Sequence, residues 1–260
     1  MVTAAQLEVE RIGEGPPVLF VHGSVVGAQI TWRKQRSLAP RWTLILPNRP
    51  GFAGSPPLER GDFEAEAPLF AELLGDGAHL VGHSYGAVIA LLAAAQRPQA
   101  VRSLTISEPG SLSVARGNPA VDEMIANGEE LFRRRGEIPI ELFLRLFRGG
   151  AHSALQTPEE LPESLRRGAE LLRDERPSWE AELPLEQLAA GPFPTLVISG
   201  DHSPAFEAVC DAIAGQLGAE RAVIGGRGHT IPSVGEPYNR RLNAFLGASE
   251  SGSAPAPPRA

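Results

Sequence analysis

The stretch Gly82-His83-Ser84-Tyr85-Gly86 fits the pattern G-x-S-x-G and lies between two segments of different character. Residues 79–81 form a short apolar run that predicts a strand, whereas residues 87–96, rich in alanine and leucine, predict a helix. In such a strand-turn-helix unit, flanking glycines allow a sharp turn that lifts the serine hydroxyl clear of neighbouring side chains. This context predicts that Ser84 is a nucleophile held on a tight turn.

The rest of the chain alternates short apolar runs with helical patterns. The apolar runs occupy residues 17–22, 42–46, 79–81, 101–106, 195–199 and 221–224, and the helical patterns occupy residues 63–74, 87–96, 205–217 and 236–246. Such alternation indicates parallel strands joined by crossover helices, and continuously apolar runs are typical of strands covered on both faces. We therefore expect an α/β fold with a mostly parallel central sheet flanked by helices.

An insertion interrupts this alternation after residue 107. Helical patterns at residues 121–135, 138–147 and 158–174 predict a helical cap. We expect a core at 1–110 and 187–247, a cap at 111–186, and a disordered tail at 248–260 that is rich in serine, proline and alanine. The apolar residues of the cap are interpreted mainly as packing, with a pocket lining as the alternative: Phe132, Leu142, Phe143, Leu146 and Phe147.

Composition excludes several classes of function. The 260 residues carry a net charge of -7, with 42% hydrophobic and 21% charged residues, as in a soluble globular protein. The short run at residues 133–135 is the one cluster of arginines, and nearby glutamates favour a solvated helix face, so nucleic acid is not an expected partner.

Cys210 is the single cysteine, which excludes an internal disulfide. Residues 1–10 do not resemble a signal peptide, and no apolar run is long enough to span a membrane, so we expect a cytoplasmic protein without membrane contact.

A serine hydroxyl needs a base whose pKa is near 7, which histidine supplies. Among the six histidines, His229 ends the loop Gly225-Gly226-Arg227-Gly228-His229, after the last strand and before the last helix. This position places it at the same edge of the sheet as the serine, so His229 is the predicted base.

A second set of groups would stabilise an oxyanion. The backbone N–H of Tyr85 begins the helix after Ser84, where the helix dipole favours negative charge. A second donor is expected from the turn after an earlier strand, and the N–H of Ser24, which follows Gly23, can face the elbow. His22 is interpreted as an anchor of this turn through its ring nitrogens, with no role in proton transfer.

Four motifs together resemble the α/β-hydrolase superfamily. They are H-G-S at residues 22–24, N-R-P-G-F-A-G-S at 48–55, G-H-S-Y-G at 82–86, and G-R-G-H at 226–229 followed by a proline and a final helix. The resemblance extends from residue 17 to residue 246 and implies an α/β-hydrolase fold. It leaves the substrate open, because esterases, lipases, C–C hydrolases, dehalogenases, epoxide hydrolases and cofactor-free peroxidases share this fold.

The sequence departs from this family at the acid that orients the histidine. Relatives usually carry it as the second aspartate of a G-D-x-D turn, but here the turn reads Gly200-Asp201-His202-Ser203. Glu108, at the end of the strand that precedes the cap, fits the position from which some relatives resembling haloalkane dehalogenases take their acid. We favour Glu108 and keep Asp201 as the alternative.

The predicted reaction is cleavage of a small, apolar carboxylic ester or lactone through an acyl-enzyme on Ser84. It requires no metal and no organic cofactor. One alternative is a C–C hydrolase of ring-cleaved dienoates or β-diketones, whose carboxylate substrates would call for an arginine such as Arg49 or Arg145. A second alternative, from another class, is a non-catalytic hydrolase fold that binds a ligand.

Overall fold

The computed structural model describes residues 2–150 and 160–252. Within them a seven-stranded sheet runs through the molecule in the order β1-β3-β2-β4-β5-β6-β7. Its strands are β1 (Val9–Ile12), β2 (Pro17–Val21), β3 (Thr43–Pro47), β4 (Ala78–His83), β5 (Val101–Ser107), β6 (Thr195–Ser199) and β7 (Glu220–Val223). All pairs from β3 to β7 are parallel, which confirms the expected α/β fold with a mostly parallel central sheet.

Strand β1 was not expected from the sequence. It pairs antiparallel with β3, with Val9 opposite Pro47 and Ile12 opposite Leu44. Its two central residues, Glu10 and Arg11, are polar, and the strand is only half-buried at the edge of the sheet. An edge strand needs no continuous apolar run, and for that reason its pattern does not stand out from a loop.

The helices in the described part of the chain are α1 (Ala28–Thr31), α2 (Phe63–Leu73), α3 (Tyr85–Gln96), α4 (Pro119–Arg133), α5 (Ile140–Gly150), α6 (Glu163–Asp174), α7 (Leu185–Ala189), α8 (Pro204–Leu217) and α9 (Glu236–Glu250). Buried residues of α2, α3 and α8 belong to one apolar cluster, while those of α1 and α9 belong to a second. The two clusters contain alternate residues of the same strands, as a sheet covered on both faces requires. No helix among the described residues is both long and apolar enough to cross a bilayer.

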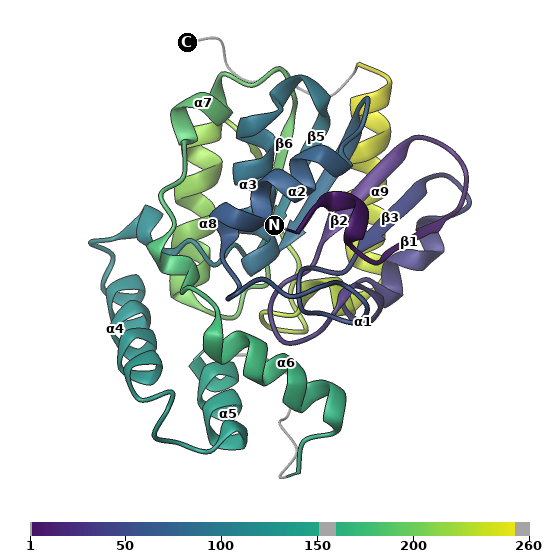
Figure 1. Ribbon diagram of the computed structural model, residues 1–260. Helices are drawn as coiled ribbons and strands as arrows, with labels where there is room; N and C mark the ends of the chain where they lie inside the picture. Colours follow the sequence, from purple (N-terminus) through teal and green to yellow (C-terminus); the bar gives the residue numbers. More distant parts are fainter. Residues whose placement is uncertain (1, 151–159, 253–260) are drawn as a thin grey trace.

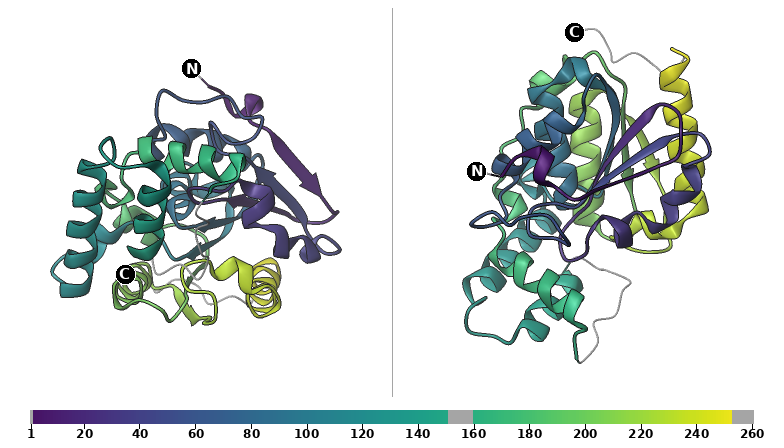
Figure 2. Two further views of the ribbon diagram at one scale, coloured as in Figure 1. Left: turned by 90° about the horizontal axis from the view of Figure 1, so that it is seen from below. Right: turned by 45° about the vertical axis from the view of Figure 1, so that its right-hand side comes forward.

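Helices α4, α5 and α6 project beyond the sheet as a separate group (Figure 1). They lie at the edge where β4 and β5 end, as the second view also shows (Figure 2). Aromatic contacts hold this group together, because the ring of Phe132 lies 5.5 Å from that of Phe143 and 5.3 Å from that of Trp179. Phe132 and Phe143 are buried, whereas Leu142 and Leu146 are exposed, so the apolar set divides between packing and surface.

The carboxyl end of the chain differs from the expectation in one respect. Helix α9 continues to Glu250, so residues 248–250 are helical and do not belong to a disordered tail. The rest of the expected tail, from residue 253, lies outside the described residues. The helix is anchored by buried Tyr238, Leu242 and Phe245, which pack against the sheet.

We expect Gly86→Ala to destabilise the fold by about 3 kcal/mol, as overpacking does. A Cβ at Gly86 would lie 2.3 Å from the carbonyl oxygens of Val21 and His22, which are backbone atoms and cannot rotate away. The matched control is Gly215→Ala in α8, where nothing lies within 4 Å and helix propensity alone should stabilise slightly. Urea unfolding measures both, and an unchanged midpoint for Gly86→Ala would contradict the close contact between α3 and β2.

Candidate active site

Ser84 occupies a strained turn between β4 and α3. Its backbone has φ 56° and ψ −122°, a conformation that residues with a Cβ rarely adopt. The neighbouring glycines make this turn possible, because a Cβ at Gly82 would lie 2.7 Å from the Cα of Ala87. Ser84 remains partly exposed just before α3, whose first seven residues are all buried.

His229 bridges Ser84 and Glu108. Its Nε2 lies 2.8 Å from the Ser84 Oγ, and its Nδ1 lies 3.1 Å from Oε2 of Glu108. An ionised carboxylate can only accept, so Nδ1 carries the proton and Nε2 is free to accept the serine hydroxyl. The three predicted residues are therefore assembled with the geometry that proton transfer from the serine requires.

His83 holds the loop that carries His229. Its Nε2 donates to the carbonyl oxygen of His229 over 2.7 Å. Burial, with a further contribution from the adjacent His229, lowers the pKa of His83 to about 3, so this ring stays neutral. A neutral ring next to the imidazole of His229 keeps the loop in place without adding a competing positive charge.

Glu108 is fully buried at the end of β5 and has φ 47°. The backbone N–H of Gly200 donates to its Oε1 over 2.6 Å, and Nε2 of His202 donates to its Oε2 over 2.7 Å. Burial by itself raises the pKa of this carboxyl group, but the hydrogen bonds from His202 and His229 outweigh it and bring the pKa to about 2. Glu108 is therefore ionised across the working pH range.

The alternative acid, Asp201, lies in the adjacent turn with φ 51° and an exposed side chain. Its backbone N–H donates to Oε1 of Glu207 over 3.0 Å, which ties this turn to α8. Ser203, at the position of the usual second aspartate, is the buried N-cap residue of α8. Of the two candidate acids, Glu108 is the one that contacts His229.

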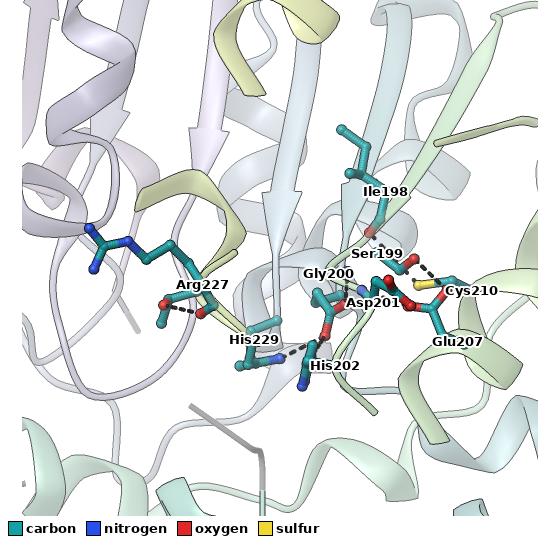
Figure 3. Close-up of polar contacts among 12 residues, drawn as sticks. Ile198, Ser199, Gly200, Asp201, His202, Glu207, Cys210, Arg227 and His229 are labelled. Carbon is teal, nitrogen blue, oxygen red and sulfur yellow. Dashed lines mark hydrogen bonds and ion pairs between the residues drawn. The ribbon is translucent and has the colours of Figure 1, made fainter. Parts of the chain in front are cut away.

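His202 and Phe206 are site residues that the sequence did not reveal. Figure 3 shows His202 next to His229, with Gly200 and Asp201 above them in the view. The Phe206 ring packs against His229 with centroids 4.5 Å apart, and His202 lies 5.5 Å from Phe206. The signal was indirect: His202 is the residue between the aspartate and the serine in the altered G-D-x-D turn.

The turn that contains Gly23 and Ser24 packs directly against the serine. A Cβ at Gly23 would lie 2.9 Å from the Cβ of Ser84, so the Gly23-Ser24 peptide passes beside the nucleophile. His22 anchors this turn as expected, because its Nε2 accepts the Arg49 backbone N–H at 2.9 Å and its Nδ1 donates to the Gly23 carbonyl at 2.8 Å. Burial lowers the pKa of His22 to about 3, which excludes a charged ring there.

Arg49 is buried behind the same turn and is bound by two carboxylates. Its guanidinium donates to both oxygens of Glu66, at 2.8 and 2.9 Å, and to Oε1 of Glu175 at 2.7 Å. Burial raises the pKa of Glu66, although the charge of Arg49 opposes this effect. Arg145, the other arginine considered for a substrate carboxylate, is exposed on α5.

One group in the described part of the chain has the composition of a metal site: Glu108, His202 and His229, whose ligand atoms lie within 4.8 Å of one another. The two imidazoles already donate to the same carboxylate oxygen, Oε2 of Glu108. A metal ion would have to replace the protons of both hydrogen bonds, including the one that leaves Nε2 of His229 free for the serine. The donor set is therefore better suited to orienting the base than to holding an ion.

Comparison with known proteins agrees with this geometry. Residues 18–241 match the alpha/beta hydrolase family. The chain belongs to that family. It is 32% identical, over 162 residues, to a pimeloyl-[acyl-carrier protein] methyl ester esterase of Chromobacterium violaceum, covering 60% of this chain and 62% of the esterase. It is 33% identical to lipase LipV of Mycobacterium tuberculosis over 48% of this chain and 50% of the lipase. The chain thus spans less than two thirds of either relative.

Solved structures share the fold at low sequence identity. Est816, described as an N-acyl homoserine lactone degrading enzyme, aligns with a TM-score of 0.63 at 24% identity, covering 92% of this chain and 96% of Est816. A putative epoxide hydrolase from Pseudomonas aeruginosa aligns with a TM-score of 0.74 at 20% identity, covering 95% and 93% of the two chains. These likenesses confirm the α/β-hydrolase fold of the chain.

The low pKa of Glu108 predicts how its replacement affects stability at different pH values. A folded-state pKa of about 2, below the ordinary 4.5, means that the carboxylate stabilises the fold fully above pH 4.5 and loses this contribution as the pH falls towards 2. The difference in the free energy of unfolding between wild type and Glu108→Gln should therefore be largest near neutral pH and shrink on acidification. Urea unfolding over this range measures it. Asp201→Asn is the control, and a difference that stays constant for Glu108→Gln would contradict the depressed pKa.

Proposed function

We propose that the chain is a serine hydrolase that cleaves a small carboxylic ester or lactone through an acyl-enzyme on Ser84. The observation that carries the proposal is the continuous hydrogen-bonded path from the Ser84 Oγ through His229 to the buried Glu108. Three groups from separate loops meet within hydrogen-bonding distance, in the order nucleophile, base and acid that acyl transfer needs. The similarity of the chain to an esterase and to a lipase supports the proposal.

In the proposed first half-reaction, Nε2 of His229 removes the Ser84 proton while Oγ attacks the ester carbonyl carbon. Negative charge moves to the carbonyl oxygen, where the backbone N–H groups of Tyr85 and Ser24 are the proposed donors. The protonated His229 then gives its proton to the leaving alkoxide, and the ester bond breaks. Glu108 stabilises the imidazolium through the proton on Nδ1, which stays on the ring.

In the second half-reaction, water takes the place of the leaving alcohol. His229 removes a proton from this water, the hydroxide attacks the acyl carbon, and the proton returns to Oγ of Ser84 as the acid is released. No residue in this scheme needs a metal or an organic cofactor. We also propose that the substrate is largely apolar near its acyl group and that the enzyme works in the cytoplasm.

A C–C hydrolase is the second candidate, because the chain is 32% identical over 124 residues to a 2-hydroxy-6-oxo-6-phenylhexa-2,4-dienoate hydrolase of Burkholderia cepacia. Such a substrate carries a carboxylate, which an arginine would bind. Arg49 is buried and bound to Glu66 and Glu175, so its charge is already compensated. This arrangement favours the ester over the dienoate.

Replacement of the triad residues tests the mechanism. On an activated short-chain ester, Ser84→Ala should abolish turnover, and Glu108→Gln should lower kcat by about a thousandfold because the imidazolium loses its charged partner. Asp201→Asn, which removes an exposed carboxylate in the adjacent turn, should retain near-wild-type kcat. If Asp201→Asn shows the large loss while Glu108→Gln stays active, the proposed acid is wrong.

A substrate panel tests the bond that is cleaved. We expect wild-type enzyme to hydrolyse activated esters or acyl lactones faster than a ring-fission dienoate, with Ser84→Ala as the inactive control. A fluorophosphonate should label Ser84 stoichiometrically, as expected for an activated serine. Preferred turnover of the dienoate would favour the C–C hydrolase, and a wild-type protein without labelling or turnover would favour the non-catalytic ligand-binding alternative.

A further inference from the structure

The turn that would form half of the oxyanion hole is strained. Val25, which follows Ser24, has φ 77°, a left-handed conformation that is a genuine outlier for a β-branched residue. Its side chain is buried. A conformation of this kind persists only where surrounding contacts impose it, so the packing around the turn should reveal what holds it.

Part of that packing comes from the cap. Helix α6 lies so close to the turn that a Cβ at Gly168 would be 1.7 Å from the carbonyl oxygen of Val25. The contact joins the backbone of a cap helix to the backbone of the turn, with no side chain between them. Gly168 itself is buried at this contact.

The second cap contact is polar. Glu175, the C-cap residue of α6, is 3% exposed, and its Oε2 accepts a hydrogen bond from the Ser24 Oγ at 2.5 Å. Its other oxygen, Oε1, accepts from Nη2 of Arg49 at 2.7 Å. A buried carboxylate with both oxygens engaged has a defined position, so it can position the groups that donate to it.

Arg49 extends this contact to the other half of the site. Its Nη1 donates to the carbonyl oxygen of Gly23 at 3.1 Å, and its guanidinium lies 4.3 Å from the centre of the Tyr85 ring. The Gly23 carbonyl belongs to the same peptide unit as the Ser24 N–H. Arg49 therefore contacts the peptide that carries the Ser24 N–H and the side chain of Tyr85. These two residues supply the proposed oxyanion donors.

We propose that Glu175 is a positioning residue for the reaction: through the Ser24 hydroxyl and Arg49, the cap holds the Gly23-Ser24 peptide where its N–H can stabilise the oxyanion. The inference rests on the ester hydrolysis proposed above. It assigns the cap a part in the chemistry besides enclosing the substrate. Glu175 contacts neither the nucleophile Ser84 nor the substrate in this scheme, so its effect is indirect.

The experiment is a double-mutant cycle with Ser24→Ala and Glu175→Gln. Ser24→Ala deletes the tethering hydroxyl but keeps the backbone N–H, and Glu175→Gln removes the charge while Arg49 keeps its partner Glu66. Glu170→Gln, in the same helix α6, is the control, since the Glu170 side chain is only partly buried and its ion pair with Arg167 is long, at 3.9 Å. All variants are assayed on the activated ester after active-site titration with a fluorophosphonate, so that kcat refers to competent sites.

We expect each single variant to lower kcat about tenfold with KM changed less than about twofold, because a loosened donor affects the transition state more than the ground state. The double variant should be no slower than the slower single variant, as expected for two residues that act through one contact. The inhibition constant of a trifluoromethyl ketone, whose adduct carries an oxyanion, should rise by the same factor as kcat/KM falls. Glu170→Gln should match wild type.

Two results would overturn the inference. In the first, the Tm falls while kcat and the ketone inhibition constant stay at wild-type values, which would mean that the contact is only structural. In the second, the two single effects multiply in the double variant, which would mean that the residues act independently. If Glu175→Gln does not fold, Ser24→Ala alone tests the inference, through its kcat and its inhibition constant for the trifluoromethyl ketone. Wild-type protein that neither hydrolyses an ester nor reacts with the fluorophosphonate contradicts the proposed function itself, and this is measured first.

Discussion

The buried carboxylate of Glu108 accepts hydrogen bonds from Gly200, His202 and His229. Gly200 and His202 lie in the turn after β6, and His229 lies in the loop before α9. Glu108 itself follows β5, so its side chain joins three loops at the edge of the sheet. Removing a carboxylate from water costs free energy unless donors replace the solvent, and here these donors do so while also lowering its pKa. The same bonds fix the tautomer of His229 and leave its Nε2 directed at the serine. The orientation of the His229 ring thus follows from the hydrogen bonds that compensate the buried charge of Glu108.

Backbone strain is concentrated around this charge. Among the described residues, five non-glycine positions have positive φ, and three of them, Ser84, Glu108 and Asp201, follow the parallel strands β4, β5 and β6. At the end of a buried parallel strand the chain must turn sharply away from the sheet, and a left-handed residue achieves this in one step. The energetic cost is met by the hydrogen bonds and packing of the surrounding core. The fourth, Val25, lies in the turn after β2, where the cap supplies the opposing contact.

Much of this arrangement could be predicted because it depends on local pattern. Continuous apolar runs marked β2 to β7, and the glycines at 82 and 86 marked the elbow, since only glycine fits the contact between α3 and β2. Glu108 could be favoured over Asp201 because its place at the end of the strand before the insertion fits the acid position of some relatives resembling haloalkane dehalogenases. Strand β1 could not be predicted, because a half-exposed edge strand has no continuous apolar run. The contacts of His202 and Glu175 could not be predicted either, because they join residues more than 90 positions apart in the chain.

The two carboxylates on Arg49 bear on which substrates the site can accept. Glu66 comes from α2 and Glu175 from the end of α6, so the arginine joins these two helices beside the turn that contains Gly23 and Ser24. An arginine surrounded in this way is a structural charge, and releasing it to bind a substrate carboxylate would leave two buried acids uncompensated.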